Sequence, residues 1–131
     1  MRFMMFMYPG ENSDGPTPEL VAAMSRYNEE LTRAGALLAL DGLHPPAASA
    51  SVTFAGGKGT VIDGPFAEAK ELVGGYWVIE AASKQEALEW AARCPAGDGA
   101  RIEVRQIAEL SDYPDDVQAA AELSRQPPEQ T

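Results

Sequence analysis

The chain lacks several residues on which common kinds of protein depend. Cys94 is its one cysteine, so an internal disulfide is excluded, and we expect the reducing cytoplasm as its location. His44 is its one histidine, and a single histidine with scattered carboxylates gives no metal-ligand spacing, so we expect neither a metal nor another cofactor. No apolar run approaches the roughly 20 residues that a membrane helix requires. Residues 1–8 carry no basic leader and predict a strand, so we expect no membrane partner.

Positive charge is also scarce. Ten Lys and Arg stand against twenty Asp and Glu, which gives a formal net charge of -10. Such a field repels phosphate backbones and anionic membranes, so nucleic acid is not expected as a partner. Part of the negative charge lies in residues 111–131, which we expect to form an acidic tail containing Pro and Gln, with a short helix at residues 119–123. Residues 1–110 are expected to form one domain.

Hydrophobic periodicity predicts strands, helices and one hairpin. Thr17 is expected to cap a first helix that stops at Gly35, and Ser83 to open a second helix that Pro95 ends. The apolar stripe of this second helix is expected at Ala87, Leu88, Ala91 and Ala92. Strands are expected at residues 2–8, 36–40, 74–82 and 101–108, and a hairpin at residues 51–54 and 60–62 around the glycine turn 56–59.

The order of these elements predicts the fold class. Strand, helix, strand, hairpin, strand, helix, strand is the order of the α+β ferredoxin-like split βαβ fold, here with an inserted hairpin. In that fold two helices cover one face of an antiparallel sheet, and the strands at residues 2–8 and 74–82 lie at its centre. Both central strands carry apolar residues on both faces. We therefore expect a second copy of the sheet to cover the open face in a homodimer.

A group of segments carries the most specific pattern in the chain. They are Asn28-Glu29-Glu30-Leu31, Leu43-His44-Pro45, Asp63-Gly64-Pro65-Phe66-Ala67-Glu68 with Lys70-Glu71, Gly74-Gly75-Tyr76-Trp77, and Glu86-Ala87-Leu88-Glu89-Trp90-Ala91. From residue 1 to about residue 110, the chain resembles the DGPF group of the YCII-related proteins. The resemblance implies a dimeric α+β barrel with a cleft between sheet and loops. It implies a family whose biochemical role is mostly unassigned, in which some relatives are associated with sigma factors.

The resemblance does not extend to one proposed mechanism. Some YCII-related proteins are thought to use a histidine and an aspartate as an acid-base pair, with the histidine on the first helix. This chain offers Tyr27 and Asn28 on that helix but no histidine. Where relatives carry Asp-Pro-Tyr after the second helix, it has Cys94-Pro95-Ala96. The mechanism is therefore not carried over to this chain.

His44 and Asp63 are the candidate catalytic residues. The pKa of a histidine lies near neutral pH, so His44 can act as a general acid or base if Asp63 orients it. The alternative is an exposed loop histidine, which we weight at about two to one because the following prolines extend the loop. Asp63 can bind a ligand or stabilise its own turn. Glu68 and Lys70 can line a cleft mouth or form surface ion pairs.

Three hypotheses for the function remain. The favoured one is a dimeric small-molecule-binding module, regulatory in role, with a cleft near the Asp-Gly-Pro-Phe turn. The second is an enzyme that performs elimination or isomerisation on a small polar or aromatic compound, with His44 and Asp63 as its acid-base pair. The third is a protein-interaction module linked to sigma-factor control. Candidate ligand-binding residues are Tyr27, Asp63, Phe66, Glu68, Lys70 and Tyr76.

Overall fold

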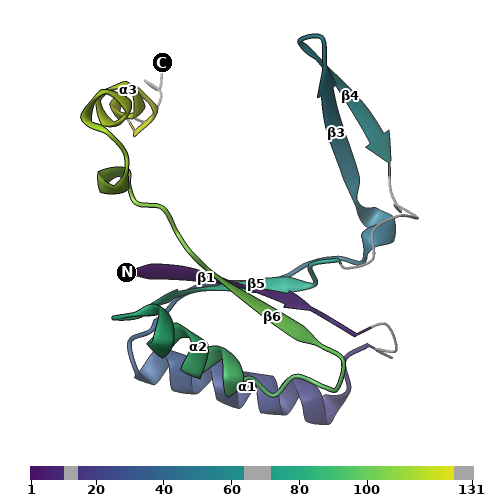
Figure 1. Cartoon of the computed structure of the whole chain (residues 1–131). Coiled ribbons are helices and arrows are strands. Elements are labelled where there is room, and N and C mark those ends of the chain that lie inside the picture. The colour runs from purple at the N-terminus through teal and green to yellow at the C-terminus, as the bar shows by residue number, and fades with distance from the viewer. Residues whose placement is uncertain (11–14, 64–71, 126–131) are drawn as a thin grey trace, which may run out of the picture.

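The computed structural model describes residues 1–10, 15–63 and 72–125. Within them, short 3-10 turns lie at Pro46–Ala48 and Leu110–Asp112. The helices and strands are β1 (Arg2–Tyr8), α1 (Pro18–Arg33), β2 (Leu37–Gly42), β3 (Ala50–Ala55), β4 (Lys58–Asp63), β5 (Gly75–Glu80), α2 (Lys84–Ala92), β6 (Arg101–Gln106) and α3 (Asp115–Arg125) (Figure 1).

Four strands form the main antiparallel sheet, in the order β2-β5-β1-β6. This order confirms the ferredoxin-like α+β prediction, with β1 and β5 at the centre. Strands β3 and β4 pair only with each other and form a separate two-stranded sheet. The inserted hairpin is therefore confirmed as well.

Helices α1 and α2 cover one face of the main sheet, below the strands in Figure 1. Side chains alternate along a strand, so every second residue of β1 and β5 points toward the helices. Those residues form the core together with the inner faces of both helices. The fully enclosed members with the largest side chains are Phe3, Met5, Leu31 and Ile79.

Both helices begin as the sequence predicts. The hydroxyl of Thr17 accepts a hydrogen bond from the backbone N–H of Leu20 at 3.1 Å, and that of Ser83 accepts one from Glu86 at 3.1 Å. In a regular capping box the Glu86 carboxylate would accept a hydrogen bond from the backbone N–H of the cap residue Ser83. Here it accepts from the preceding residue, Ala82, at 2.7 Å. Helix α1 ends at Arg33, and Gly35, just after the cap residue Ala34, has a φ of 71° in the left-handed region.

The expected apolar stripe of α2 is partly wrong. Ala87 is buried and Ala91 packs against the core, but Leu88 is 41% exposed and Ala92 is also exposed. Trp90 packs against the core in their place. The bulky indole reaches α1, where its ring lies 6.4 Å from that of Tyr27, so side-chain length matters here as well as spacing.

Two segments project from the other side of the sheet and form separate arms (Figure 1). One is the β3–β4 hairpin, which turns at Gly56 and Gly57 alone, both with positive φ. The expected four-residue turn at 56–59 is wrong, since Lys58 and Gly59 already pair in the ladder. The other arm carries α3, which is longer than the short helix expected at residues 119–123.

Candidate functional site

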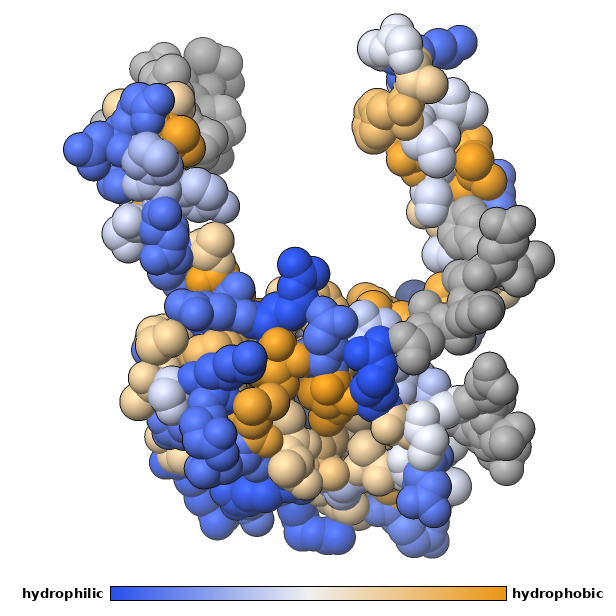
Figure 2. All heavy atoms as spheres, in the orientation of Figure 1, coloured by the Kyte–Doolittle hydropathy of each residue, from blue (hydrophilic) through white to orange (hydrophobic). Residues whose placement is uncertain are grey.

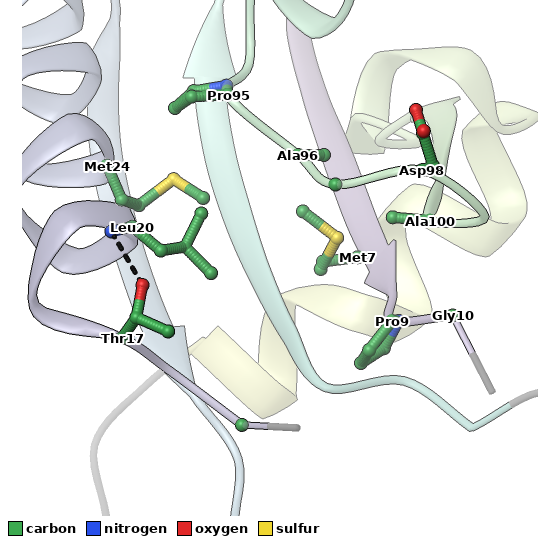
Figure 3. A pocket seen from close by; sticks show the side chains of 12 residues that line it. Met7, Pro9, Gly10, Thr17, Leu20, Met24, Pro95, Ala96, Asp98 and Ala100 are labelled. Atoms are coloured by element: carbon green, nitrogen blue, oxygen red, sulfur yellow. Dashed lines mark hydrogen bonds between the residues drawn. The ribbon is translucent and has the colours of Figure 1, made fainter. Parts of the chain in front are cut away.

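A cavity of about 420 Å³ opens between α1, the end of β1 and the loop that follows α2 (Figure 3). Ligand sites commonly measure roughly 300–1,000 Å³ and are mostly apolar. The lining of this cavity is dominated by apolar side chains and glycines. The lining residues are Met7, Pro9, Gly10, Gly15, Thr17, Leu20, Met24, Pro95, Ala96, Gly97, Asp98 and Ala100.

The helical wall of this cavity follows from spacing along α1. Residues four apart lie on one line of a helix, so Leu20 and Met24 point in the same direction. Both point toward Met7 of β1 across the opening (Figure 3). Thioether side chains adapt to ligands of different shape and make favourable contacts with aromatic rings.

A second cavity, of about 200 Å³, continues the first toward the middle of α1. The two share Met7 and Met24, so we treat them as one feature and call it the α1 groove. Asn28, which lies four residues and about one helical turn after Met24, lines this second segment. Its other lining residues are Leu40, Asp41, Gly42, Gly74, Gly75, Tyr76 and Trp77.

Asn28 is the polar side chain that α1 contributes to the groove. Its carbonyl oxygen accepts a hydrogen bond from the indole N–H of Trp77 at 2.8 Å. An indole nitrogen can only donate, so this bond fixes which end of the amide faces Trp77. The amide nitrogen of Asn28, with two donors, is therefore turned away from Trp77. Within the described part of the chain, no further hydrogen bond of this side chain is found.

Tyr76 borders the far end of the groove, but strand alternation turns its side chain, with that of its cross-strand partner Asp41, to the open face of the sheet. Its hydroxyl donates to the Asp41 carboxylate at 2.8 Å. This hydrogen bond, together with the negative charge of Asp41, raises the pKa of Tyr76, because ionising the phenol would place two anions side by side. Tyr76 therefore remains a neutral donor at physiological pH.

Tyr27 and Cys94 lie behind the groove. Tyr27 is buried in the core, where its hydroxyl donates to the backbone oxygen of Trp90 at 2.6 Å, and burial raises its pKa. The Cys94 thiol lies 3.9 Å from the sulfur of Met24, and burial raises its pKa to about 11. The thiolate form of Cys94 is thus disfavoured at neutral pH. The ligand-binding role assigned to Tyr27 has no lining position in the described cavities to support it.

The proposed acid-base pair lies away from the α1 groove. His44 is exposed and lines a different cavity of about 290 Å³, with Leu43 and Leu72 among its neighbours. Asp63 is exposed at the end of β4, opposite Ala50. Among the described residues, no hydrogen bond or ion pair joins His44 to a carboxylate. Three of the predicted site residues, Phe66, Glu68 and Lys70, lie outside the described residues.

Two searches of the described ranges concern cofactors and membranes. In residues 1–10, 15–63 and 72–125, no three His, Cys, Asp or Glu side chains gather closely enough to hold a metal ion. None of the helices described there combines the length and apolarity needed to cross a bilayer.

Sequence reasoning named Tyr76 as a ligand-binding candidate for a cleft near the Asp-Gly-Pro-Phe turn, and it did not single out Met7, Met24 and Asn28, which line the groove. Met24 was assigned only to the apolar face of the first helix. The useful signal was the step of four from Leu20 through Met24 to Asn28, which extends an apolar line to an amide. In this chain the amide of Asn28 ends the apolar line of α1, at the point where the helix borders the narrower cavity.

Two comparisons place the chain among known proteins. The sequence model of one family, the YCII-related domain, matches residues 1–111. An uncharacterized protein from Rhizobium meliloti (strain 1021) is 38% identical over 68 residues, which is 52% of this chain and 55% of that protein. The chain therefore spans about half the length of this curated relative.

Proposed function

We propose that the chain, which belongs to the YCII-related domain family, is a dimeric small-molecule-binding module with its ligand in the α1 groove. We further assign it to the DGPF group of that family, on the strength of the sequence Asp63-Gly64-Pro65-Phe66. A regulatory role fits such a module, in which ligand binding changes the surface offered to a partner.

The observation that carries the proposal is the continuity of the groove. Its wider segment measures about 420 Å³ and shares the lining residues Met7 and Met24 with the narrower one. The apolar lining supplies binding energy, while the Asn28 amide supplies a polar group that orients a ligand. No described residue of the groove is arranged as a nucleophile with an adjacent base, which favours binding over chemistry.

The open face of the sheet supports the dimer. On that face the central strands present Met4, Phe6 and Val78, all only partly buried. The neighbouring strand β6 presents positive and negative side chains on the same face. Glu103 lies 3.7 Å from Arg101 and 3.7 Å from Arg105. An apolar strip beside paired charges is complementary to its own copy turned by a two-fold rotation.

The exposed apolar face of the hairpin arm also supports a second copy of this chain as the partner. An isolated two-stranded hairpin is marginally stable in water. Val52, Phe54 and Val61 share one face of the hairpin and are 51%, 79% and 67% exposed (Figure 2). A second copy seated on the sheet between the arms would bury this face, so the proposal commits to a second copy of this chain as the occupant.

Methionine methyl signals test ligand binding in the groove directly. The chain has five methionines, so a sample labelled at the methionine methyl carbons gives a simple NMR spectrum. A screen of small neutral, cationic and anionic aromatic compounds is expected to shift the signals of Met7 and Met24. Met4, on the opposite face of the sheet, serves as the internal reference.

A matched pair of variants locates the binding. Leu20→Asn places an amide in the groove wall and is expected to weaken binding about tenfold, by the loss of roughly 1.5 kcal/mol of apolar contact. Val21→Asn changes the next residue, which is 51% exposed and lies outside the groove lining, and is expected to bind as wild type. Equal loss in both variants, or unmoved Met7 and Met24 signals throughout the screen, would remove the groove as the site.

The acid-base enzyme and the sigma-factor partner stay predictions. The enzyme hypothesis needs a carboxylate within hydrogen-bond reach of His44. Because His44 and the α1 groove lie on different cavities, a His44→Ala variant separates the hypotheses. It would leave ligand binding in the groove unchanged if the module function is correct.

A further inference from the structure

We propose that the α1 groove selects neutral ligands that carry a carbonyl-type hydrogen-bond acceptor on an apolar, preferably aromatic, body. This inference rests on the proposed ligand-binding function and names the class of ligand. The acceptor would be received by the amide nitrogen of Asn28, and the body would lie between Met7 and Met24.

The first step of the argument is the orientation of Asn28. Its oxygen is committed to the Trp77 indole N–H at 2.8 Å, and the reverse orientation would face two donors against each other. The Asn28 amide therefore presents an N–H donor to the groove at this point. A half-buried donor without a partner disfavours an apolar group and favours a ligand that supplies an oxygen acceptor.

The rigidity of the surroundings is the second step. Trp77 is 6% exposed and its ring meets that of Tyr27 edge to face at 6.0 Å. Tyr27 is in turn held by its hydrogen bond to the Trp90 backbone. Because Trp77 cannot easily turn, the Asn28 amide is held in place before a ligand arrives, which lowers the entropy cost of binding.

The third step concerns charge. The ionisable residues that border the groove are acidic or remain neutral. They are Asp98 beside the wide segment, and Asp41 and Tyr76 beside the narrow one, with both of these side chains on the open face of the sheet. The chain as a whole carries a net charge of -10. The acidic residues beside the groove and the negative net charge of the chain both disfavour an anionic ligand, such as one that carries a carboxylate. A ketone or carboxamide supplies the same acceptor without the repulsion.

The body of the ligand follows from the groove walls. Leu20, Met24 and Met7 face one another across the wide segment (Figure 3). Met7 and Met24 also line the narrow segment, together with Asn28. Sulfur of methionine contacts aromatic rings favourably. An aromatic carboxamide therefore fits both segments, with its ring in the methionine segment and its carbonyl at Asn28.

Three aromatic probes of one shape test the inference. Benzamide carries the neutral carbonyl, benzoate replaces it with an anion, and benzylamine has no acceptor. We expect benzamide to bind with a Kd on the order of 1 mM, typical for so small a ligand, and benzoate at least about tenfold more weakly. Binding is followed by the methionine methyl signals and by the two indole N–H signals of the chain, with Trp90 as reference for Trp77.

Asn28→Asp is the matched variant. It has nearly the same shape and still accepts from Trp77, but it has no donor for the ligand. We expect benzamide binding to fall about tenfold or more, with the Trp77 indole signal retained as evidence of an intact fold. The ratio of benzamide to benzoate binding on the wild-type protein gives a second readout that needs no variant.

The outcomes separate this inference from the function on which it rests. Benzamide shifts at Met7, Met24 and the Trp77 indole, reduced in Asn28→Asp, would support it. Methyl shifts with all three probes alike, without an effect of Asn28→Asp, would overturn the ligand class while leaving the groove as a binding site. Unmoved methyl signals with these probes and with the wider screen would overturn both.

Discussion

Cys94 illustrates how one side chain reports on its surroundings. Its thiol is partly buried behind the α1 groove, and burial raises its pKa from the ordinary value of 9.0 to about 11. No described cation offsets this effect, so the residue behaves as a small apolar group rather than as a reactive thiol.

Alkylation of Cys94 is expected to follow this raised pKa. At pH 8 the thiolate fraction is about 100-fold lower than for an unperturbed thiol, because the pKa lies about two units higher. Iodoacetamide should therefore react roughly 100-fold more slowly with the folded protein than with protein unfolded in urea. The comparison is measured by mass spectrometry over a pH series, and equal rates in both states would contradict the placement of Cys94.

The same shift predicts a pH dependence of stability. The folded protein holds the thiol proton more tightly than the unfolded chain, so this contribution is fully present below about pH 9. It is lost as the pH rises from about 9 through about 11. The difference in free energy of unfolding between wild type and Cys94→Ala should shrink or reverse over that window. A difference independent of pH would argue against the shift.

At the scale of single elements, the β3–β4 hairpin depends on its turn. Gly56 and Gly57 have φ of 58° and 77°, a pair of left-handed conformations that suits the twist of a two-residue hairpin. Any side chain with a Cβ is strained there. Among the described residues, β3 and β4 pair with each other and with no further strand, so a strained turn acts on a marginal element.

Gly57→Ala is expected to open the hairpin selectively. The strain costs on the order of 1 kcal/mol, which is comparable to the stability of an isolated hairpin. Amide exchange at Val52 and Val61 should become fast, while the β1–β5 ladder stays protected. Gly97→Ala is the matched control, since Gly97 lacks a positive φ and an added Cβ would meet nothing within 4 Å. Uniform loss of protection in both sheets would show that the hairpin is coupled to the body.

Much of the element order could be predicted because its signals are local. Thr17, Ser83 and Gly35 act on their own neighbours, so the helix boundaries are visible in sequence. The turn length of the hairpin was wrong because four adjacent glycine or lysine residues do not show which two adopt positive φ. Trp90 was missed because its burial depends on reach toward α1, which is a tertiary property.

The candidate site was predictable only in part for a related reason. Strand alternation predicted that Tyr76 and Trp77 point to opposite faces of the sheet, and the pairing of β1 with β5 turns Trp77 toward the helices and Tyr76 to the open face. The α1 groove itself forms where Met7, Met24 and the loop at Pro95 meet, and these residues are far apart in sequence. Asp63 drew attention instead, although it does not line the groove.

At the scale of the whole molecule, the open sheet face is the feature that one copy leaves incomplete. Phe6 lies at its centre, paired with Tyr76 of β5 on one side and Glu103 of β6 on the other. Two copies each carrying a net charge of -10 repel at long range, so the attraction in the proposed dimer would have to come from the apolar strip.

Phe6→Lys is expected to convert the proposed dimer to a monomer. The lysine would place a charge in the apolar strip, while Glu103 opposite would supply a partner and spare the fold. Sedimentation velocity measures the state, and circular dichroism checks the fold. Leu88→Lys, on the exposed side of α2, is the control and should sediment as wild type. Added salt should strengthen the wild-type dimer by screening the repulsion, and a monomeric wild type at high concentration would end the proposal.

The register shift in β2 has a consequence for solubility. Between Leu37 and Ala39 the pairing with β5 slips by one residue, so that Leu38 stands outside the ladder and is 51% exposed. β2 forms one rim of the sheet, and a kinked rim is a poor template for a further strand. The opposite rim, β6, carries Arg101 and Arg105, whose charges resist stacking of the same kind. Both rims of the sheet thus disfavour growth into filaments, which leaves the face-to-face contact of the proposed dimer.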